Sequence, residues 1–402
     1  MRQSTIGLAI SSGIFIDTGR RTGKTINKCR YRPVSCISYE YGALANTPAH
    51  LHRRDYSILL IPPYQALARQ FGNYLQLSGS YRRRWRSFAK LARPKSQESP
   101  VFQHIQWPAD DQAQRLFHGR GHAWPGFEHL NIDWYAPLVL VTLYAEVDES
   151  WLSELEQQLL AGLKRCRPDH AGQLSVVVQH RCRPDAPFTL LCGQLPEQLV
   201  IKEDGLSYWL HLNRSQNTGL FLDMANGRRW VRGHSDGRRL LNLFAYTCGF
   251  SLAALAGGAS KVVNVDMSRA ALSHGRENHR LNDHDLSRVV FEGVDIFKSF
   301  GRLKKHGPYD LLICDPPTFQ KGSVDIRRDY AKLLRRLPEL MVAGGDCLLC
   351  LNAPDLGEDF LLAEVAQHAP HCVLVERLAN PPVFIEAQAG RGLKVLHFRY
   401  QP

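Results

Sequence analysis

The sequence predicts an α/β protein whose main part, residues 216–402, folds as a Rossmann-like, doubly wound parallel sheet. Short runs rich in Val, Leu and Ile alternate there with helix-like segments, the pattern of a parallel sheet covered by helices on both faces. Acidic residues and a Pro-Pro turn follow several of these runs, at positions where parallel sheets bind ligands. We expect residues 101–215 to form a smaller α/β or β-rich accessory domain, and residues 1–100 to form a basic, disordered segment.

Residues 1–100 carry the excess positive charge of the chain. They contain 17 Lys and Arg against 4 Asp and Glu, whereas residues 101–402 have a net charge of −1. The cluster Arg82–Arg86, which includes Trp85, has the composition of a phosphate-binding segment, although a solvated basic tail is the simpler interpretation. A third interpretation is that translation starts near Val101.

The composition disfavours several classes of protein. No run approaches the ~20 consecutive apolar residues that a membrane-spanning helix needs, and the short apolar run Ile6–Ile16 lacks the cleavage pattern of a signal peptide. The ten cysteines are dispersed, so we expect a reducing, cytoplasmic environment and no bound metal. Cys347 and Cys350 form a C-x-x-C inside an apolar run, and we interpret them as buried strand thiols.

The accessory region is predicted from its β-branched runs. The expected elements are strands at Leu138–Leu143 and Ser175–Gln179, a helix at Trp151–Lys164 between them, and a hairpin of Leu199–Lys202 and Ser207–Leu212. The hairpin is supported by the turn sequence Glu203-Asp-Gly205. Upstream, His118–Gly126 is a Gly-rich loop with one Arg, two His and one Trp, which has two open interpretations: contact with a nucleic acid, or a turn that uses His and Trp for packing.

The main region is predicted from alternating strands and helices. The expected strands are Leu240–Phe244, Lys261–Val265, Val289–Glu292, Leu311–Cys314, Asp346–Leu351, Cys372–Arg377 and Lys394–Arg399, with helices that start near Ser251, Ala270, Asp325 and Asp359. The carboxyl ends of parallel strands meet at one edge of a sheet. Residues that follow these strands are therefore the candidates for ligand binding.

The first two strand ends favour S-adenosylmethionine (SAM) as the cofactor. Asp266 follows the second strand, where a carboxylate accepts hydrogen bonds from ribose hydroxyls, and Met267 beside it is placed to pack on an adenine. Dinucleotides use a carboxylate there too, but they also need G-x-G-x-x-G in the first turn, to hold a pyrophosphate. The turn Asn242–Ser251 offers one glycine, Gly249, so SAM is favoured.

The turn Asp315-Pro-Pro-Thr-Phe319 after the fourth strand is the most specific feature. Pro316 and Pro317 fix the backbone and remove two N–H donors, which leaves a rigid row of acceptors beside the carboxylate of Asp315. Such a row suits a planar base that carries amino groups, and Phe319 is placed to stack on that base.

These motifs carry a resemblance to a known family. The sequence resembles the bacterial class I SAM-dependent methyltransferases that modify large-subunit ribosomal RNA. The resemblance lies in four segments: Asp315–Phe319, Leu241–Phe250, Val265–Ser268 and Asn217–Asp223. The resemblance covers roughly residues 200–400. It is nearest to the guanine-N7 methyltransferase domain, to which the 5-methylcytosine methyltransferases of 23S ribosomal RNA are related.

The resemblance implies roles for individual residues. It implies that the methionine end of SAM is lined by Phe244, Tyr246, Thr247 and Gly249. It also implies that Asp266 holds the ribose, that Asp295 lies near the adenine, and that the target base is met by Asp315 to Phe319. Phe221 and Asp223, in a loop over the cofactor, and Asn242 are further cofactor-binding candidates. Asn352 resembles an asparagine of the guanine enzyme at this point and is a catalytic candidate.

One departure from the cytosine enzymes separates two chemistries. Methylation of cytosine C5 requires a cysteine that adds to the ring, and those relatives carry it in a Ser-Cys-Ser segment. In the corresponding stretch, Leu351–Asp355, Ala353 takes the place of the cysteine. Guanine N7 has a free lone pair, so its methylation needs alignment and desolvation but no general base. We therefore expect Asp315 and the prolines to position the base.

The leading prediction is a SAM-dependent methyltransferase that acts on a base nitrogen of RNA, most specifically a guanine of large-subunit rRNA, with residues 101–215 as an RNA-docking module. The near-neutral charge of residues 101–402 opposes it. Three basic groups, at Arg228–Trp230, Arg327–Arg328 and Arg335–Arg336, form either an RNA-binding face or solvated helix surfaces. The alternatives are a methyltransferase of small molecules or proteins, and a non-catalytic scaffold that binds SAM or RNA.

Overall fold

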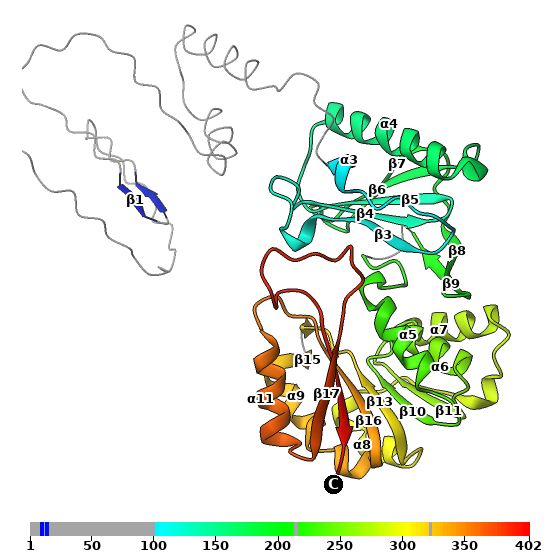
Figure 1. Cartoon of the computed structure of the whole chain (residues 1–402), viewed down its shortest axis with the longest axis vertical. Coiled ribbons are helices and arrows are strands. Elements are labelled where there is room, and N and C mark those ends of the chain that lie inside the picture. Colours follow the sequence, from blue (N-terminus) through cyan, green and yellow to red (C-terminus); the bar gives the residue numbers. More distant parts are fainter. Residues whose placement is uncertain (1–8, 12, 16–100, 213–215, 321–323) are drawn as a thin grey trace, which may run out of the picture. The chain divides into compact units, whose positions relative to one another are not determined.

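A computed structural model of the protein describes residues 9–11, 13–15, 101–212, 216–320 and 324–402 (Figure 1). The chain divides into two compact units, Met1–Arg93 and Pro94–Pro402. In the first unit, β1 (Ala9–Ser11) pairs antiparallel with β2 (Gly13–Phe15). The other predictions for residues 1–100, including the basic cluster Arg82–Arg86, lie outside the described residues.

A five-stranded sheet, the accessory sheet, follows in the second unit (Figure 1). In spatial order its strands are β3 (Gln114–His118), β4 (Leu130–Tyr135), β5 (Leu138–Leu143), β6 (Ser175–His180) and β7 (Phe188–Cys192). The short helix α3 (Val101–His104) precedes them, and α4 (Glu149–Cys166) connects the parallel strands β5 and β6. The predicted strands and helix of this region are confirmed, whereas β3, β4 and β7 were not predicted.

The two faces of the accessory sheet differ in character. Ile132 and Trp134 of β4 pack with Leu159 of α4 in one hydrophobic cluster. Asn131 and Asp133 alternate with them along the strand and lie on the opposite face, where both are buried. The sheet therefore has an apolar face against α4 and an opposite face that carries buried polar side chains beside apolar ones.

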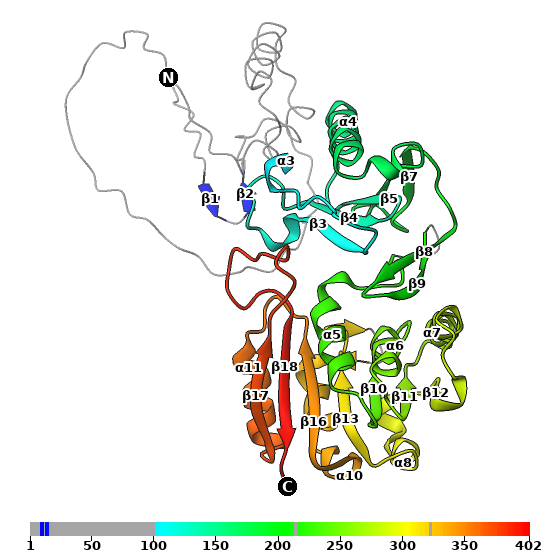
Figure 2. The same cartoon turned by 45° about the vertical axis from the view of Figure 1, so that its right-hand side comes forward.

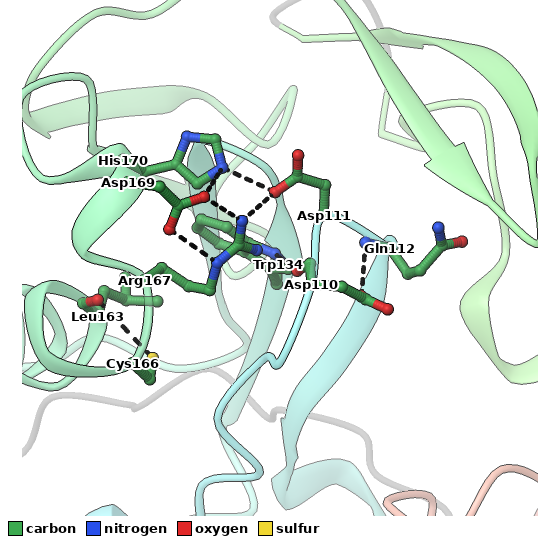
Figure 3. Close-up of polar contacts among 9 residues, drawn as sticks. All are labelled: Asp110, Asp111, Gln112, Trp134, Leu163, Cys166, Arg167, Asp169 and His170. Atoms are coloured by element: carbon green, nitrogen blue, oxygen red, sulfur yellow. Dashed lines mark hydrogen bonds and ion pairs between the residues drawn. The ribbon is translucent and has the colours of Figure 1, made fainter.

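A network of ion pairs fastens the end of α4 to the segment before β3 (Figure 3). The guanidinium group of Arg167 donates to Asp169 (Nε to Oδ1, 3.1 Å) and to Asp111 (Nη2 to Oδ1, 2.5 Å), and His170 Nε2 lies 2.7 Å from the same Asp111 oxygen. Asp111, Asp169 and His170 are close enough together to resemble a set of metal ligands. Since the guanidinium engages both carboxylates, an ion-pair network explains the cluster.

The predicted hairpin consists of β8 (Gln198–Glu203) and β9 (Leu206–His211). Its turn residues Asp204 (φ 49°) and Gly205 (φ 78°) both have positive φ, which a type I′ turn requires. The hairpin packs on α7 (Arg269–Leu281), where Asn278 Oδ1 accepts a hydrogen bond from the Trp209 N–H at 2.8 Å. A helix side chain thus satisfies an edge of the hairpin.

A seven-stranded sheet, the large sheet, fills the rest of the unit (Figure 2). In spatial order its strands are β12 (Val289–Glu292), β11 (Lys261–Val265), β10 (Arg239–Leu243), β13 (Tyr309–Cys314), β16 (Met341–Leu351), β18 (Lys394–Tyr400) and β17 (Cys372–Leu378). The neighbours from β12 to β16 are parallel, and β18 runs antiparallel to β16 and β17. All seven predicted strands are confirmed.

Helices cover both faces of the large sheet. They are α5 (Ala225–Gly233), α6 (Gly249–Ala256), α7, α8 (Phe300–Lys304), α9 (Ile326–Leu334), α10 (Leu337–Leu340) and α11 (Glu358–His368). Leu241 and Leu243 of β10 pack in one cluster with residues of α9 and α11, and Leu240 packs with residues of α5 and α6 in another. The doubly wound arrangement is confirmed, and Cys347 and Cys350 are buried strand residues, as predicted.

The accessory sheet and the large sheet share hydrophobic packing. Tyr135 and Leu140 of the accessory sheet belong to the same cluster as Tyr208 of the hairpin and Leu252 of α6. Both regions lie in one compact unit. A domain boundary at residue 215 therefore stays a proposal. Among the described helices, none combines the length and the apolar character that crossing a bilayer requires.

Candidate active site

A cavity of about 380 Å³, the cofactor cavity, lies at the carboxyl ends of β10, β11 and β13. The order of the strands reverses around β10, which is the point where open α/β sheets bind ligands. Thirteen of the fifteen predicted site residues line this cavity: Phe221, Asp223, Phe244, Tyr246, Thr247, Gly249, Asp266, Met267, Asp295, Asp315, Pro316, Pro317 and Asn352. The exceptions are Asn242 and Phe319.

The turn after β10 adopts an uncommon backbone conformation. Phe244 (φ 57°), Tyr246 (φ 46°) and Cys248 (φ 65°) all have left-handed φ values, which carry strain for residues other than glycine. Residues of this turn line the cavity, and Gly249 begins α6 there.

Asp266, directly after β11, is anchored by backbone groups on two sides. Its Oδ2 accepts a hydrogen bond from the Tyr246 N–H at 2.8 Å, and its Oδ1 accepts one from the Ser268 N–H at 2.7 Å. Burial raises the pKa of Asp266, and the two backbone N–H groups oppose this rise. Each carboxylate oxygen keeps a further lone pair, which is what two ribose hydroxyls need.

The loop 217–223 closes one side of the cavity and is tied to the turn after β10. Thr247 Oγ1 donates to the Gly219 carbonyl at 2.5 Å, and the ring centroids of Phe221 and Tyr246 lie 5.4 Å apart. Gly219 has a φ of 125°, and an added Cβ would lie 2.8 Å from the Trp209 carbonyl oxygen, so a side chain is excluded there. Phe221 is 45% exposed, as expected for a side chain that borders a cavity.

Arg228 of α5 holds this loop from behind, a role that the sequence did not indicate. The buried guanidinium group donates to both carboxylate oxygens of Glu203 at 2.5 and 2.7 Å and to the Phe221 carbonyl at 2.9 Å. The interpretation of Arg228 as part of an RNA-binding face or solvated helix surface is wrong, because the side chain is buried in this ion pair. Its bidentate geometry joins the hairpin to the loop.

Two acidic residues line the cavity: Asp315, directly after β13, and Asp223, in the loop 217–223. Burial, reinforced by the charge of Asp223, raises the pKa of Asp315 to about 7, and Arg228 opposes the rise. Burial also raises the pKa of Asp223, against the charges of Arg115 and Arg228. A cationic ligand in the cavity would favour the ionised form of these carboxyl groups.

The Pro-Pro turn is linked to the end of β16. The Thr318 hydroxyl donates to the Asn352 carbonyl, which joins the two strand ends. Asn352 is exposed and lines the cavity. Phe319 lies in β14 (Phe319–Gln320), which pairs with β15 (Val324–Asp325), and its side chain is outside the described residues.

The opposite end of the cavity carries Asp295 and Met267. Asp295 Oδ1 accepts the Phe297 N–H at 2.9 Å and caps a short turn, and Met267 is 48% exposed. Asn242, in contrast, is buried inside β10, and its Nδ2 donates to Asn264 Oδ1 at 2.9 Å. The structure does not bring Asn242 to the cavity wall, because its side chain packs between strands.

Cysteine is absent from the described residues that line the cofactor cavity. Cys314 and Cys350, in the neighbouring strands, are buried, and burial raises the pKa of both thiols. Ala353 is also buried, and its carbonyl accepts a hydrogen bond from Lys394 Nζ at 2.8 Å. The described cavity wall therefore offers no thiolate nucleophile.

Two residues of the Gly-rich loop at residues 118–126, Gly121 and Trp124, are used for packing. Trp124 stacks on His104 with ring centroids 3.7 Å apart, and the Gly121 carbonyl accepts the Ala387 N–H at 2.7 Å. An added Cβ on Gly121 would lie 1.9 Å from the Ile385 carbonyl oxygen, so the glycine permits this close contact. These contacts favour the packing interpretation for Gly121 and Trp124, whereas Arg120 of the same loop lies over the Tyr144 ring, 4.5 Å from its centroid.

The remaining basic groups on the helices are engaged with partners. Ion pairs join Arg327 to Asp355, Arg328 to Asp329 and Arg336 to Glu339, and Arg335 contacts His368. Charged side chains that are paired in this way contribute less positive potential to a surface than their number suggests.

Known proteins resemble this chain over the same region. Residues 114–399 match the family described as S-adenosylmethionine-dependent methyltransferase. Ribosomal RNA large subunit methyltransferase I of Yersinia pseudotuberculosis and that of Yersinia pestis are each 30% identical over 295 residues, which are 70% of this chain and 72% of the relative.

Solved structures have the same fold. A methyltransferase crystallised with S-adenosylhomocysteine is 25% identical with a TM-score of 0.65, and covers 76% of this chain and 83% of its own. A SAM-dependent methyltransferase from Streptococcus mutans is 25% identical with a TM-score of 0.64, and covers 76% and 82%. The cavity, with the anchored carboxylate of Asp266 in its wall, fits the same cofactor. The chain belongs to the family of S-adenosylmethionine-dependent methyltransferases.

Proposed function

We propose that this enzyme transfers the methyl group of SAM to a nitrogen atom of an RNA base, and that the base is a guanine of large-subunit ribosomal RNA. The observation that carries the choice of nitrogen is the absence of cysteine from the described wall of the cofactor cavity. A ring carbon of cytosine becomes nucleophilic only after a thiolate adds to the ring. A ring nitrogen with a free lone pair needs no such step.

The cavity contains side chains for each part of the cofactor. In this proposal Asp266 holds the ribose, the turn from Phe244 to Gly249 holds the methionine end, and Asp295 and Met267 hold the adenine. Residues of all three groups line the cofactor cavity. SAM, when bound, supplies an electrophilic methyl group on a sulfonium. The protein then has to orient the acceptor nitrogen in line with that group and exclude water from it.

The Asp315-Pro-Pro turn supplies the orientation of the base in this proposal. The two prolines hold a row of carbonyl acceptors rigid, and the tie between Thr318 and Asn352 fixes the turn against the next strand. Guanine carries N–H donors on its Watson–Crick edge, and these suit carbonyl and carboxylate acceptors. Asp315 acts here as a hydrogen-bond acceptor, and no proton has to be removed from N7.

RNA as the substrate is supported by the relatives, which are named ribosomal RNA methyltransferases. We also propose that the enzyme acts in the cytoplasm. The eight cysteines in the described part of the chain are all free thiols, which suits that reducing compartment.

The test is methylation of large-subunit rRNA purified from a strain that lacks the gene. The RNA is incubated with the enzyme and isotopically labelled SAM, digested to nucleosides and analysed by mass spectrometry. We expect label in 7-methylguanosine. Label in 5-methylcytidine would refute nitrogen chemistry, and label in proteins or small molecules of a cell extract, without label in RNA, would refute the RNA substrate.

A further inference from the structure

A second cavity, of about 320 Å³, adjoins the cofactor cavity on the polar face of the accessory sheet. Six residues line both cavities: Asn217, Gly219, Leu220, Phe221, Asp223 and Asn352. The loop 217–223 is thus a shared wall. A polymer with one unit in the cofactor cavity can place an adjacent unit in the second cavity.

A row of neutral polar side chains forms the floor of the second cavity. Asn131 of β4 is the register partner of Thr142 in β5, and Thr142 is the partner of Gln179 in β6. All three side chains are buried and line the cavity. Gln179 Nε2 donates to the Gln216 carbonyl at 3.0 Å, and Asn131 Oδ1 accepts the Arg120 N–H at 3.4 Å. Each amide has further donor and acceptor capacity, which a ligand in the cavity can use. Amide and hydroxyl groups supply donors and acceptors, as nucleobase edges require.

Two arginines and a tyrosine stand at the same cavity, just beyond the strands. The guanidinium carbon of Arg120 lies 4.5 Å from the ring centroid of Tyr144, and that of Arg181 lies 5.6 Å from it. Arginine binds phosphate groups in bidentate fashion, and an aromatic ring stacks on bases. The combination suits a nucleotide, because one group of side chains meets its phosphate and another meets its base.

The charges of Arg120 and Arg181 are available to a ligand. Arg115, in the same cavity, is neutralised by Asp133 through hydrogen bonds of 2.6 and 3.2 Å. Burial and the charge of Arg115 lower the pKa of His118 to about 3, so this residue is uncharged. Within the described part of the chain, Arg120 and Arg181 contact the Tyr144 ring and form no ion pair.

We propose that the second cavity binds the nucleotide of the RNA strand next to the methylated base. In this arrangement, Tyr144 stacks on the base, Arg120 and Arg181 bind the phosphate, and the row Asn131–Thr142–Gln179 contacts the base edge. The inference rests on the proposed function and gives the accessory region its RNA-docking role. An acidic peptide would pair with the arginines, but its acidic side chains carry no planar ring to stack on Tyr144.

The test compares Arg120→Ala, Arg181→Ala and Tyr144→Ala with the full-length wild type. Tyr144→Phe keeps the ring, and Arg165→Ala removes an exposed arginine from α4, on the opposite face of the sheet. RNA affinity is measured with a fluorescent single-stranded 12-nucleotide RNA of mixed sequence, methyl transfer with the rRNA described above, and SAM affinity by calorimetry. Thermal melting checks that each variant is folded.

We expect each alanine variant to weaken RNA binding by about five- to tenfold and to raise KM for rRNA. SAM affinity should stay within about twofold, and Tyr144→Phe and Arg165→Ala should behave like the wild type. Unchanged RNA affinity in all three folded alanine variants would overturn the inference, as would an equal loss in Arg165→Ala. If the wild type binds RNA through these residues but methylates none, the proposed function fails while the second cavity stands as an RNA site.

Discussion

The raised pKa of Asp315 makes the stability of the fold depend on pH. Its pKa is about 7 in the folded protein, against an ordinary value of 3.8, because the group is buried and Asp223 is near. Between these two values the folded protein keeps a proton that the unfolded chain has lost. The contribution of Asp315 to stability is therefore fully present below about pH 4 and is lost progressively as the pH rises to about 7.

The size of this effect follows from the difference between the two pKa values. About three pKa units, at 1.36 kcal/mol each, set an upper limit of about 4 kcal/mol. The carboxyl group borders a cavity that admits water, so we expect about 2 to 4 kcal/mol. Asn has a similar shape and no charge, and Asp315→Asn should therefore be more stable than the wild type at pH 8 and equally stable at pH 4.

The assay is urea unfolding of the wild type and Asp315→Asn between pH 4 and 8. Asp148→Asn is the matched control, because Asp148 is exposed and makes no side-chain capping bond to α4. The difference between Asp315→Asn and the wild type cancels the contributions of other titrating groups. A difference that does not change with pH, or a variant that is less stable than the wild type at pH 8, would refute the reasoning. Methyl transfer by the stabilised variant should fall, because a positioning acceptor is lost.

Three further predictions concern the cofactor, the ion pair and the cysteines. Asp266→Ala should lower SAM affinity by about 10- to 100-fold in calorimetry, since a charge-assisted contact is lost, and an unchanged affinity would remove this residue from the cofactor site. Glu203→Gln leaves Arg228 buried without its counter-charge and should cost about 3 kcal/mol in urea unfolding, whereas an exposed ion pair would cost less than 1 kcal/mol. Cys314→Ala and Cys350→Ala should each keep most of the methyl transfer per folded molecule, and complete loss in either would indicate a covalent mechanism.

The strand ends of the large sheet could be predicted because two simple patterns coincide there. Parallel strands buried on both faces give continuous apolar runs, and the residues beyond them meet at one edge. Asp266 and Asp315 follow such runs and both reach the cavity. Asn242 belongs to the same motif but lies inside β10, where its side chain packs against Asn264. Proximity in sequence to a strand end does not settle where a side chain points.

The accessory sheet was harder to predict because its polar face is buried. β4 alternates Leu130 and Ile132 with Asn131 and Asp133, a pattern that is typical of a strand with one face in water. All four side chains are buried here. A pattern of alternation reports a difference between two faces, but it does not report what covers the polar one. The loop 217–223, which is distant in sequence from β4, lies over this face and lines the second cavity together with it.

The net charge of residues 101–402 does not show where positive charge is left unpaired. Ion pairs join Arg115, Arg167 and Arg228 to carboxylates and leave the sum unchanged, whereas Arg120 and Arg181 form no ion pair in the described part of the chain and give a local positive potential. If two phosphate contacts come from Arg120 and Arg181, replacing both by Ala should reduce the slope of log affinity against log salt by about 1.4. This difference is independent of any contribution from residues 1–100, because both proteins contain them. An equal slope in the two proteins would mean that the arginines do not contact phosphate, even if RNA binding itself is weakened.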